Sequence, residues 1–339
     1  MNDKSFFPVV TTIQRPTKAV LDFDRVLKRE GVALVVVGDR KGPDSFDLKG
    51  ASFLSLQEQL RSDFSLAGLL PENHYARKNI GYLYAIAQGS NCIYETDDDN
   101  APLNGWSVRE KSLAAAAVSA KGWVNAYSFF TSENIWPRGF PLDEVVGAKT
   151  PMRGELREVE APIQQGLANS SPDVDAVWRL ILDRPFQFDN AESIYLQPGS
   201  WCPFNSQSTW WWPEAFPLMY LPSYCSFRMT DIWRSFIAQR CLWEMGYGVV
   251  FHAPEVMQER NEHNLMRDFV DEIPGYTRNK ELVAVLEGLP LEGGLDTACN
   301  NLKLCYEALI SRNFFPRKEL DLIEAWLADI KAGVEGVAD

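Results

Sequence analysis

The sequence predicts an α/β protein with a Rossmann-type mixed sheet flanked by helices and a small C-terminal helical extension. A continuous valine-rich run over 33–37 is typical of a parallel strand that is buried on both faces. Segments with the apolar spacing of amphipathic helices flank such runs, and the last quarter of the chain is mainly of this kind. The chain has 339 residues, 46% of them apolar, which suffices for one large domain or two smaller ones. We expect a main body at 1–255 and the helical extension at 256–339.

Strands and helices are expected to alternate along the first hundred residues. Thr17 has the hydroxyl side chain typical of a helix N-cap, and the helix that it starts ends at Gly31. A second helix has apolar residues at i, i+3, i+4 and i+7 and ends at Gly89. The elements expected here are strands over 6–13, 33–37 and 92–94 and helices over 18–30 and 75–88.

The middle of the chain is less regular. Residues 147–161 are polar and charged and are expected to form a flexible connection. Asp173 and Asp175 precede an apolar helix start, where acidic side chains cap a helix and complement its dipole. The elements expected further on are a helix over 227–245, a strand over 247–251 that ends at His252, and helices over 281–289, 297–311 and 317–331.

Composition limits the class of protein. The net charge of −13 argues against a surface that binds nucleic acid or anionic membranes. The six cysteines form no C-x-x-C pair and lie mostly in apolar context, so we expect buried, reduced thiols. The N-terminus lacks the apolar core of a signal peptide, and no apolar run approaches the roughly 18 residues that span a bilayer. We therefore expect no transmembrane segment and a reducing compartment, most simply the cytoplasm. The helical extension is expected either to pack on the core or to make a homodimer contact.

Three consecutive carboxylates, Asp97, Asp98 and Asp99, directly follow the short strand over 92–94. Ligands of open α/β sheets bind beyond the carboxyl ends of the strands. Three aspartates placed there repel one another unless a cation lies between them, and Mg²⁺ or Mn²⁺ is commonly shared with a substrate phosphate. The alternative is a solvated acidic turn, since Asp and Asn favour turns.

Four further side chains are candidates for binding a nucleotide. Asp39 follows the second strand, where an acid accepts hydrogen bonds from a ribose or base; otherwise it is a turn residue. Arg77 and Lys78 lie at a helix start, where cations are unfavourable unless an anion docks beside the free N–H groups. Arg138 lies on a stiff Pro-Arg-Gly loop and suits bidentate recognition of phosphate. A solvated surface position is the alternative for these three basic residues.

Residues 201–224 contain eight aromatic side chains interspersed with amides and hydroxyls. Sugars present apolar C–H faces and many hydroxyl groups, so this segment suits a sugar acceptor, and aromatic core packing is the alternative. The acceptor-binding candidates, which extend into the following helix, are Asn205, Gln207, Trp210, Trp233 and Arg234.

Several motifs carry a family resemblance. The sequence from His74 to Gly89, followed by Asp97–Asp99, resembles the A-R-N-x-G helix and the DxD strand of GT-A glycosyltransferases. More closely, the chain resembles the STELLO family of glycosyltransferases over roughly residues 6–260. The segments that carry this resemblance are 77–100, 136–142, 164–169, 172–175, 202–207 and 227–234. A more distant similarity, to the reversibly glycosylated polypeptides that include UDP-arabinopyranose mutases, rests on 97–99, 137–139, 231–233 and His252.

The resemblance implies a GT-A-like fold and a metal-dependent transfer of sugar from a nucleoside diphosphate sugar, with UDP favoured, to a hydroxyl of a glycan or glycoconjugate acceptor. Asp97 and Asp99 would hold Mn²⁺ or Mg²⁺, and His252 would be a further metal or phosphate ligand by analogy with GT-A enzymes. Asp98 would face the sugar or the metal. The remaining donor contacts would be Asp39 and Asn79 to the nucleoside and Arg77 or Lys78 to the phosphates.

Asp231 is the candidate general base. A base must take the proton of the acceptor hydroxyl and must not itself be a metal ligand, which excludes Asp97 and Asp99. The rival role of Asp231 is that of an N-cap. Two alternative functions would use the same fold: a nucleotide-sugar mutase with no outside acceptor, and a non-catalytic scaffold, since plant STELLO proteins associate with cellulose synthase complexes.

Overall fold

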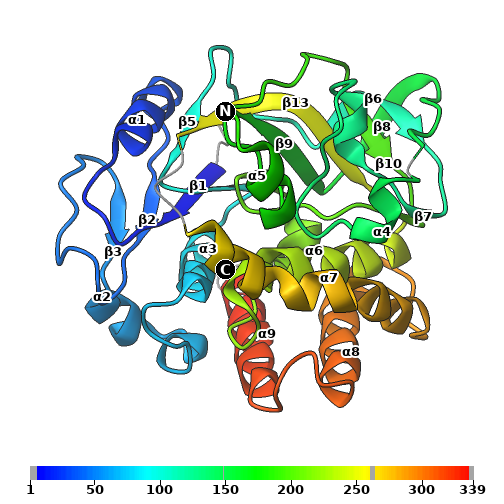
Figure 1. The fold of residues 1–339 in the computed structure, drawn as a ribbon. Coiled ribbons are helices and arrows are strands. Elements are labelled where there is room, and N and C mark those ends of the chain that lie inside the picture. The colour runs from blue at the N-terminus through cyan, green and yellow to red at the C-terminus, as the bar shows by residue number, and fades with distance from the viewer. Residues whose placement is uncertain (1–5, 148, 260–263, 336–339) are drawn as a thin grey trace.

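The computed structural model describes residues 6–147, 149–259 and 264–335 (Figure 1). An 11-stranded mixed sheet has the order β3-β2-β1-β4-β12-β9-β13-β10-β6-β8, with β5 paired to β13. The strands are β1 Phe6–Thr11, β2 Val35–Val37, β3 Ser52–Leu54, β4 Cys92–Thr96, β5 Asn100–Pro102, β6 Ser112–Val118, β8 Leu156–Glu160, β9 Ile163–Asn169, β10 Ile194–Leu196, β12 Ser208–Trp211 and β13 Val249–Gln258. The short strands β7 Gly122–Trp123 and β11 Ser200–Trp201 form a second, two-stranded sheet. The predicted α/β class with a mixed sheet is confirmed.

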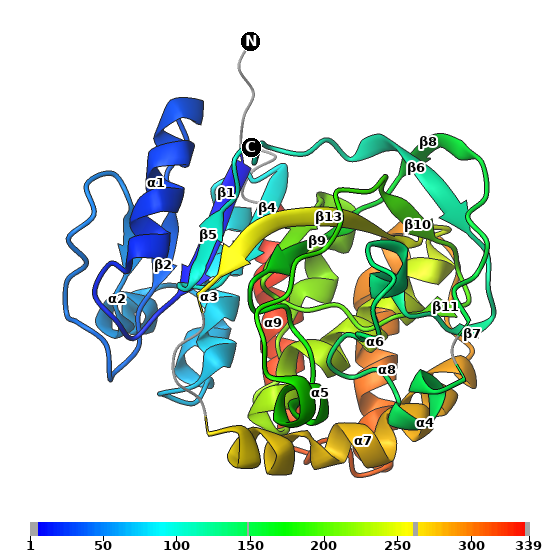
Figure 2. The same cartoon turned by 45° about the horizontal axis from the view of Figure 1, so that its top comes forward.

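The helices cover the sheet and continue beyond it (Figure 2). They are α1 Lys18–Glu30, α2 Leu56–Arg61, α3 Lys78–Ala87, α4 Leu142–Val145, α5 Ala176–Leu182, α6 Thr230–Glu244, α7 Leu265–Glu287, α8 Ala298–Ser311 and α9 Glu319–Glu335. Short 3₁₀ turns, among them η2 Tyr75–Arg77 and η5 Phe227–Met229, precede α3 and α6. Among the described helices none combines the length and the apolar character needed to cross a membrane.

The strands β3, β2, β1 and β4 form a parallel unit. Alternate side chains of its strands enter two different cores, because successive residues of a strand face opposite sides of the sheet. Val9 packs in the core that contains Ile80 of α3, whereas Val10 packs in the core that contains Phe23 of α1. The chain leaves β1 towards β2 on one side, and β4 lies on the other side. Ligands bind at such a reversal of strand order in open α/β sheets.

Gly81 of α3 allows this helix to pack closely on the sheet. A Cβ atom at this position would lie 2.6 Å from side-chain carbons of both Val9 and Val37. Because buried strand residues cannot move away cheaply, a larger residue here would push α3 off β1 and β2. The expected helix over 75–88 is confirmed, with its first turn tightened to 3₁₀ geometry in η2.

Most expected elements differ from the structure by a few residues at their ends, but two segments of the sheet differ more. The strand expected to end at His252 continues to Gln258, and its pairing with β9 shifts register on both sides of Pro254. The predicted domain boundary between 255 and 256 therefore falls inside β13. The connection expected at 147–161 contains β8, which pairs antiparallel with β6 at the edge of the sheet.

The C-terminal helices share the largest hydrophobic core with the sheet. Leu282 of α7, Leu309 of α8 and Trp326 of α9 belong to the same buried cluster as Ile80 of α3. Helix α7 begins at Leu265, well before the expected position 281. The reason is that its first half buries Asp268 and Glu272, so apolar periodicity does not mark its inner face.

Candidate functional site

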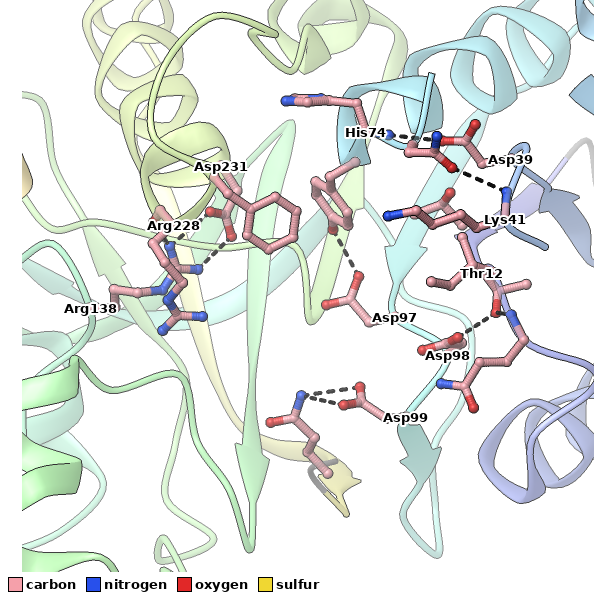
Figure 3. Close-up of a pocket in the computed structure, with 17 residues that line it drawn as sticks. Thr12, Asp39, Lys41, His74, Asp97, Asp98, Asp99, Arg138, Arg228 and Asp231 are labelled. Carbon is pink, nitrogen blue, oxygen red and sulfur yellow. Dashed lines mark hydrogen bonds and ion pairs between the residues drawn. The ribbon is translucent and has the colours of Figure 1, made fainter. Parts of the chain in front are cut away.

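A cavity of about 360 Å³ lies at the carboxyl ends of β1, β2 and β4 and extends to the start of α6. The residues that line it are Thr11, Thr12, Ile13, Gln14, Asp39, Lys41, Asn73, His74, Tyr75, Asp97, Asp98, Asp99, Arg138, Phe227, Arg228, Asp231 and Gln258. Figure 3 shows two groups, with Thr12, Asp39, Lys41 and His74 on one side and Arg138, Arg228 and Asp231 on the other. Asp97 and Asp99 lie between these groups (Figure 3).

Asp97 is held by two donors from the segment that starts α3. The Tyr75 hydroxyl donates to Asp97 Oδ1 at 2.8 Å, and Lys78 Nζ lies 3.1 Å from the same oxygen. Lys78 is fully buried and also donates to the Thr96 carbonyl at 2.7 Å. Burial raises the pKa of Tyr75 well above its ordinary value, and the charge of Asp97 adds to the effect, so this phenol is a hydrogen-bond donor at neutral pH.

Asp98 is tied to the loop that follows β1. The hydroxyl of Thr12 donates to its carboxylate, and the hydroxyl of Thr17, the N-cap of α1, donates to its backbone carbonyl. Burial raises the pKa of Asp98; the Thr12 hydrogen bond opposes this shift, and the charge of Asp97 adds to it. The loop after β1 and the acidic motif after β4 are therefore held together across the point where the strand order reverses.

Asp99 is bound from the end of β13. Gln258 Nε2 lies 3.1 Å from Oδ1 and 3.0 Å from Oδ2 of Asp99. Gln207 Nε2 in turn donates to Gln258 Oε1 at 2.9 Å. Gln207 is thus one step removed from the cavity and fixes the amide that meets Asp99.

On the opposite wall, Arg138 is enclosed by two carboxylates. Its Nε and Nη2 each lie 2.8 Å from an oxygen of Asp173. Its Nη1 and Nη2 lie 3.0 and 2.8 Å from the two oxygens of Asp231, and Nη1 also donates to the carbonyl of Arg228. These contacts use all five N–H groups of the guanidinium. Burial by itself would lower the pKa of Arg138, but Asp173 and Asp231 keep it well above its ordinary value.

Asp97 and Asp99 are the residues that would hold a divalent cation in this cavity. Among the described residues, no three His, Cys, Asp or Glu side chains are grouped so as to hold a metal ion by themselves. Asp97 and Asp99 nevertheless offer carboxylate oxygens to one cavity, and Mg²⁺ is usually held by one or two carboxylates together with substrate phosphates. The donor set therefore fits Mg²⁺ or Mn²⁺ shared with a phosphorylated ligand.

Comparison with known proteins gives the family. Residues 228–335 match the family described as STELLO glycosyltransferases. The chain is 30% identical over 277 residues to an Arabidopsis thaliana protein named probable glycosyltransferase STELLO2, an alignment that covers 73% of this chain and 35% of the relative. It is 27% identical over 355 residues to STELLO1 of the same plant, covering 96% of this chain and 44% of that protein.

The chain belongs to the STELLO glycosyltransferase family. It spans less than half the length of these curated relatives. The matched segment 228–335 begins at the cavity wall, with Arg228 and Asp231, and continues through the C-terminal helices.

In this STELLO-family chain two of the predicted phosphate and nucleoside ligands, Arg77 at the end of η2 and Asn79 in α3, bind other parts of the protein. Arg77 is buried and donates to Gln59 Oε1 and to the carbonyls of Ala67 and Leu70. Asn79 exchanges two hydrogen bonds with the backbone of Leu221. Neither residue lines the cavity, because both are on the inner side of the chain, where they satisfy backbone groups.

His252 lies in the sheet, away from the cavity. Its Nδ1 is 2.7 Å from Ser193 Oγ, and its Nε2 is 2.9 Å from Gln164 Oε1. The Gln164 amide nitrogen donates to backbone carbonyls, so Oε1 accepts and His252 carries its proton on Nε2. Burial lowers the pKa of His252 well below its ordinary value. Both ring nitrogens are engaged and the residue is fully buried, which leaves no position for a metal.

The predicted acceptor residues are buried in the structure, and none lines the cavity. Trp210 packs against Phe6, with ring centroids 5.5 Å apart. Trp233 donates to Asn279, and Arg234 pairs with the buried carboxylate of Glu95 at 2.6 Å. The amide of Asn205 accepts from the backbone of Gln207. The physical reason is that burial of large aromatic side chains stabilises the core, and buried amides and ions are tolerated there when other groups of the protein hydrogen-bond to them.

Several lining residues were not among the sequence candidates. They are Thr12, Gln14, Lys41, His74, Tyr75, Phe227, Arg228 and Gln258. Thr12 and Gln14 lie within three residues of the end of β1, and this position after a buried strand is a signal that could have identified them from the sequence. Gln258 is the last residue of the unexpected extension of β13, and Phe227 lies four residues before Asp231. Only the tertiary structure brings these two side chains to the cavity.

Proposed function

We propose that this chain is a metal-dependent glycosyltransferase that moves a sugar from a nucleoside diphosphate sugar to a hydroxyl group of an acceptor. The observation that carries the proposal is that Asp97, Asp98 and Asp99 share one cavity with Asp231, at a reversal of strand order in the sheet. Membership of a family described as glycosyltransferases supports the same reaction class.

The donor would lie along the wall formed by the ends of β1, β2 and β4. Asp39 accepts from the backbone of Arg40 at 2.7 Å and of His74 at 2.8 Å, and its carboxylate oxygens retain lone pairs for a ribose or base. Lys41 is exposed at the same wall and is a cation for a phosphate group. UDP is the nucleotide favoured by the resemblance of the motifs.

Asp97 and Asp99 would hold Mg²⁺ or Mn²⁺, which as a Lewis acid would stabilise the charge of the departing nucleoside diphosphate. The buried Lys78 fixes Asp97, and Gln258 fixes Asp99, so both carboxylates are positioned before a ligand arrives. Such preorganisation avoids the cost of ordering the side chains during binding.

Asp231 would accept the proton of the acceptor hydroxyl. Its pairing with Arg138 uses one lone pair on each carboxylate oxygen, and the backbone N–H of Ile232 uses another, at 3.1 Å from Oδ1. One lone pair on Oδ2 remains available for the hydroxyl. Asp231 also accepts a hydrogen bond from a backbone N–H in the first turn of α6, and this stabilising role does not depend on catalysis.

The test is a screen of nucleotide sugars with and without Mn²⁺, read out by thermal shift and by release of the nucleoside diphosphate. We expect Mn²⁺-dependent stabilisation by one class of UDP-sugar and slow release of UDP without acceptor. Conversion of the donor into an isomeric nucleotide sugar would instead identify a mutase. Absence of any nucleotide or nucleotide-sugar binding would overturn the proposal and favour a scaffold.

A further inference from the structure

The mouth of the cavity carries an aromatic side chain that the fold does not bury. Phe227 is 57% exposed, although it lines the same cavity as the acidic motif. One other large apolar side chain with comparable exposure lines the same cavity: Ile13, which is 53% exposed and follows β1, but it is not aromatic. An exposed phenylalanine ring in a functional cavity marks a surface for an apolar partner face.

The ring is held in place. Its centroid lies 6.0 Å from that of Tyr75 at an interplanar angle of 74°, an edge-to-face arrangement that aromatic pairs prefer. Tyr75 is itself fixed by its hydrogen bond to Asp97. Phe227 is therefore linked to the acidic motif through Tyr75, while much of its ring stays exposed to solvent.

The neighbours of Phe227 are those of an acceptor subsite. Arg228 follows it directly, and Asp231 lies four residues on, in the first turn of α6. Arg228 donates from Nε to Glu272 at 2.9 Å, and its Nη2 forms an ion pair with the same carboxylate at 2.8 Å, which holds this cation at the cavity wall. Asp39 and Lys41, the proposed donor contacts, come from the strand ends on the opposite wall (Figure 3).

We infer that Phe227 is the platform on which an acceptor pyranoside stacks, so that one of its hydroxyl groups meets Asp231. A pyranose ring combines an apolar C–H face, which suits an aromatic ring, with equatorial hydroxyls, which suit the carboxylate of Asp231 and the guanidinium of Arg228. This inference rests on the proposed function. It places the acceptor on Phe227 rather than on Trp210 or Trp233, which have no free face.

The test compares Phe227→Ala with Phe227→Trp, which keeps an aromatic face. The probes are a panel of methyl glycopyranosides, with UDP release from the UDP-sugar identified in the screen as the readout. We expect Phe227→Ala to raise the acceptor KM about 3- to 10-fold, the effect of losing one aromatic contact, and Phe227→Trp to stay near wild type. Acceptor-independent UDP release and UDP affinity should not change in either variant. Because the side chain is exposed, both variants should fold, and Met266→Ala, which alters an exposed residue outside the cavity, is the matched control.

A second readout does not depend on turnover. Saturation-transfer NMR with the same methyl glycopyranosides, in the presence of UDP and Mn²⁺, should show contact at ring C–H protons that disappears in Phe227→Ala. An unchanged acceptor KM and NMR signal in Phe227→Ala would overturn the inference, as would an equal loss of acceptor-independent UDP release, which would place the donor sugar on Phe227. If no glycopyranoside binds or stimulates release while UDP still binds, the pyranoside class is wrong although the proposed function stands.

Discussion

Arg138 donates to both carboxylate oxygens of Asp231, with N···O distances of 3.0 and 2.8 Å, and no N–H group of this guanidinium is left over. A residue that the sequence suggested as a phosphate ligand thus holds the candidate general base in place. Gly139, at φ +89°, lets the loop turn directly after Arg138, and a Cβ there would lie 2.4 Å from a side-chain carbon of Ile232 in α6. The close contact of Gly139 with Ile232 therefore helps to hold Arg138 next to Asp231.

Replacement of Arg138 distinguishes binding of a phosphate from positioning of Asp231. Arg138→Lys keeps a charge but cannot hold two carboxylates bidentately, so we expect turnover to fall while the UDP affinity measured by calorimetry is unchanged. Arg138→Met should also lower the free energy of unfolding by about 3–5 kcal/mol, since it leaves buried carboxylates unpaired. Arg179→Lys, at a buried ion pair with Asp268 outside the cavity, is the control and should lose stability without losing turnover. A weaker UDP affinity in Arg138→Lys would return this residue to phosphate binding.

Asp231→Asn tests the general base. Asn keeps the shape of the side chain but cannot accept the proton, so donor binding should be normal and turnover should fall roughly 10²–10⁴-fold. The control is Asp268→Asn, another buried carboxylate paired with an arginine but outside the cavity. If turnover with the true acceptor stays near wild type, Asp231 serves only the helix start and the pairing with Arg138.

The metal carboxylates should differ in their effect on stability. Asp97→Ala and Asp99→Ala are both expected to abolish the Mn²⁺ dependence of UDP binding in calorimetry. Asp97→Ala should in addition lower the free energy of unfolding by about 1.5–3 kcal/mol, because it removes a charged partner of the buried Lys78. Asp44→Ala removes an exposed acid that does not line the cavity and should change neither property. Unchanged UDP affinity with and without Mn²⁺ in both variants would exclude the metal assignment.

Asp39 is expected to contact the nucleoside. Asp39→Ala should weaken UDP binding by about 1.5–3 kcal/mol for each hydrogen bond that is lost. The carboxylate also accepts from the backbone of His74, so Asp39→Asn is the milder variant and should preserve the melting temperature better. A crystal structure with UDP in which the base lies far from residue 39 would contradict this prediction.

The stability of the chain should depend on pH through Asp175, the N-cap of α5. Burial raises the pKa of Asp175 to about 6, and hydrogen bonds from Trp178 and Trp136 only partly oppose the shift. The folded state then keeps a proton that the unfolded state releases above an ordinary pKa near 3.9, so stability falls as pH rises from about 4 to about 6. Asp175→Asn should remove this pH dependence. Between pH 4 and pH 6 the free energy of unfolding of wild type should fall by up to ~3 kcal/mol relative to that of the variant. Urea unfolding at pH 4 and pH 7 measures it, and a parallel pH dependence in both proteins would contradict it.

Local sequence determined much of the framework. The helix α1 has the predicted bounds, the predicted N-cap Thr17 and the predicted end at Gly31, because capping and apolar spacing act within a few residues. The valine-rich strand, the helix that contains Gly81 and the carboxylates after β4 also lie where the sequence places them. Asp97, Asp98, Asp99, Asp39 and Asp231 were predicted from their positions relative to strands and helices, and all five line the cavity.

Only the tertiary structure decided which polar side chains meet a ligand. Arg77, Asn79, Arg234 and His252 carry side chains that could bind a ligand, but each is satisfied by other groups of the protein, and for Asn79, Arg234 and His252 these groups lie 88 to 142 residues away in the sequence. Conversely, Phe227 is exposed and Trp210 is buried, although both are aromatic residues of one region. Composition and spacing report what a side chain can do. Whether it binds a ligand depends on which backbone carbonyls, carboxylates and rings the folded chain brings within about 3–4 Å of it. Some of these groups, such as the Leu221 backbone that pairs with Asn79, lie more than a hundred residues away in the sequence.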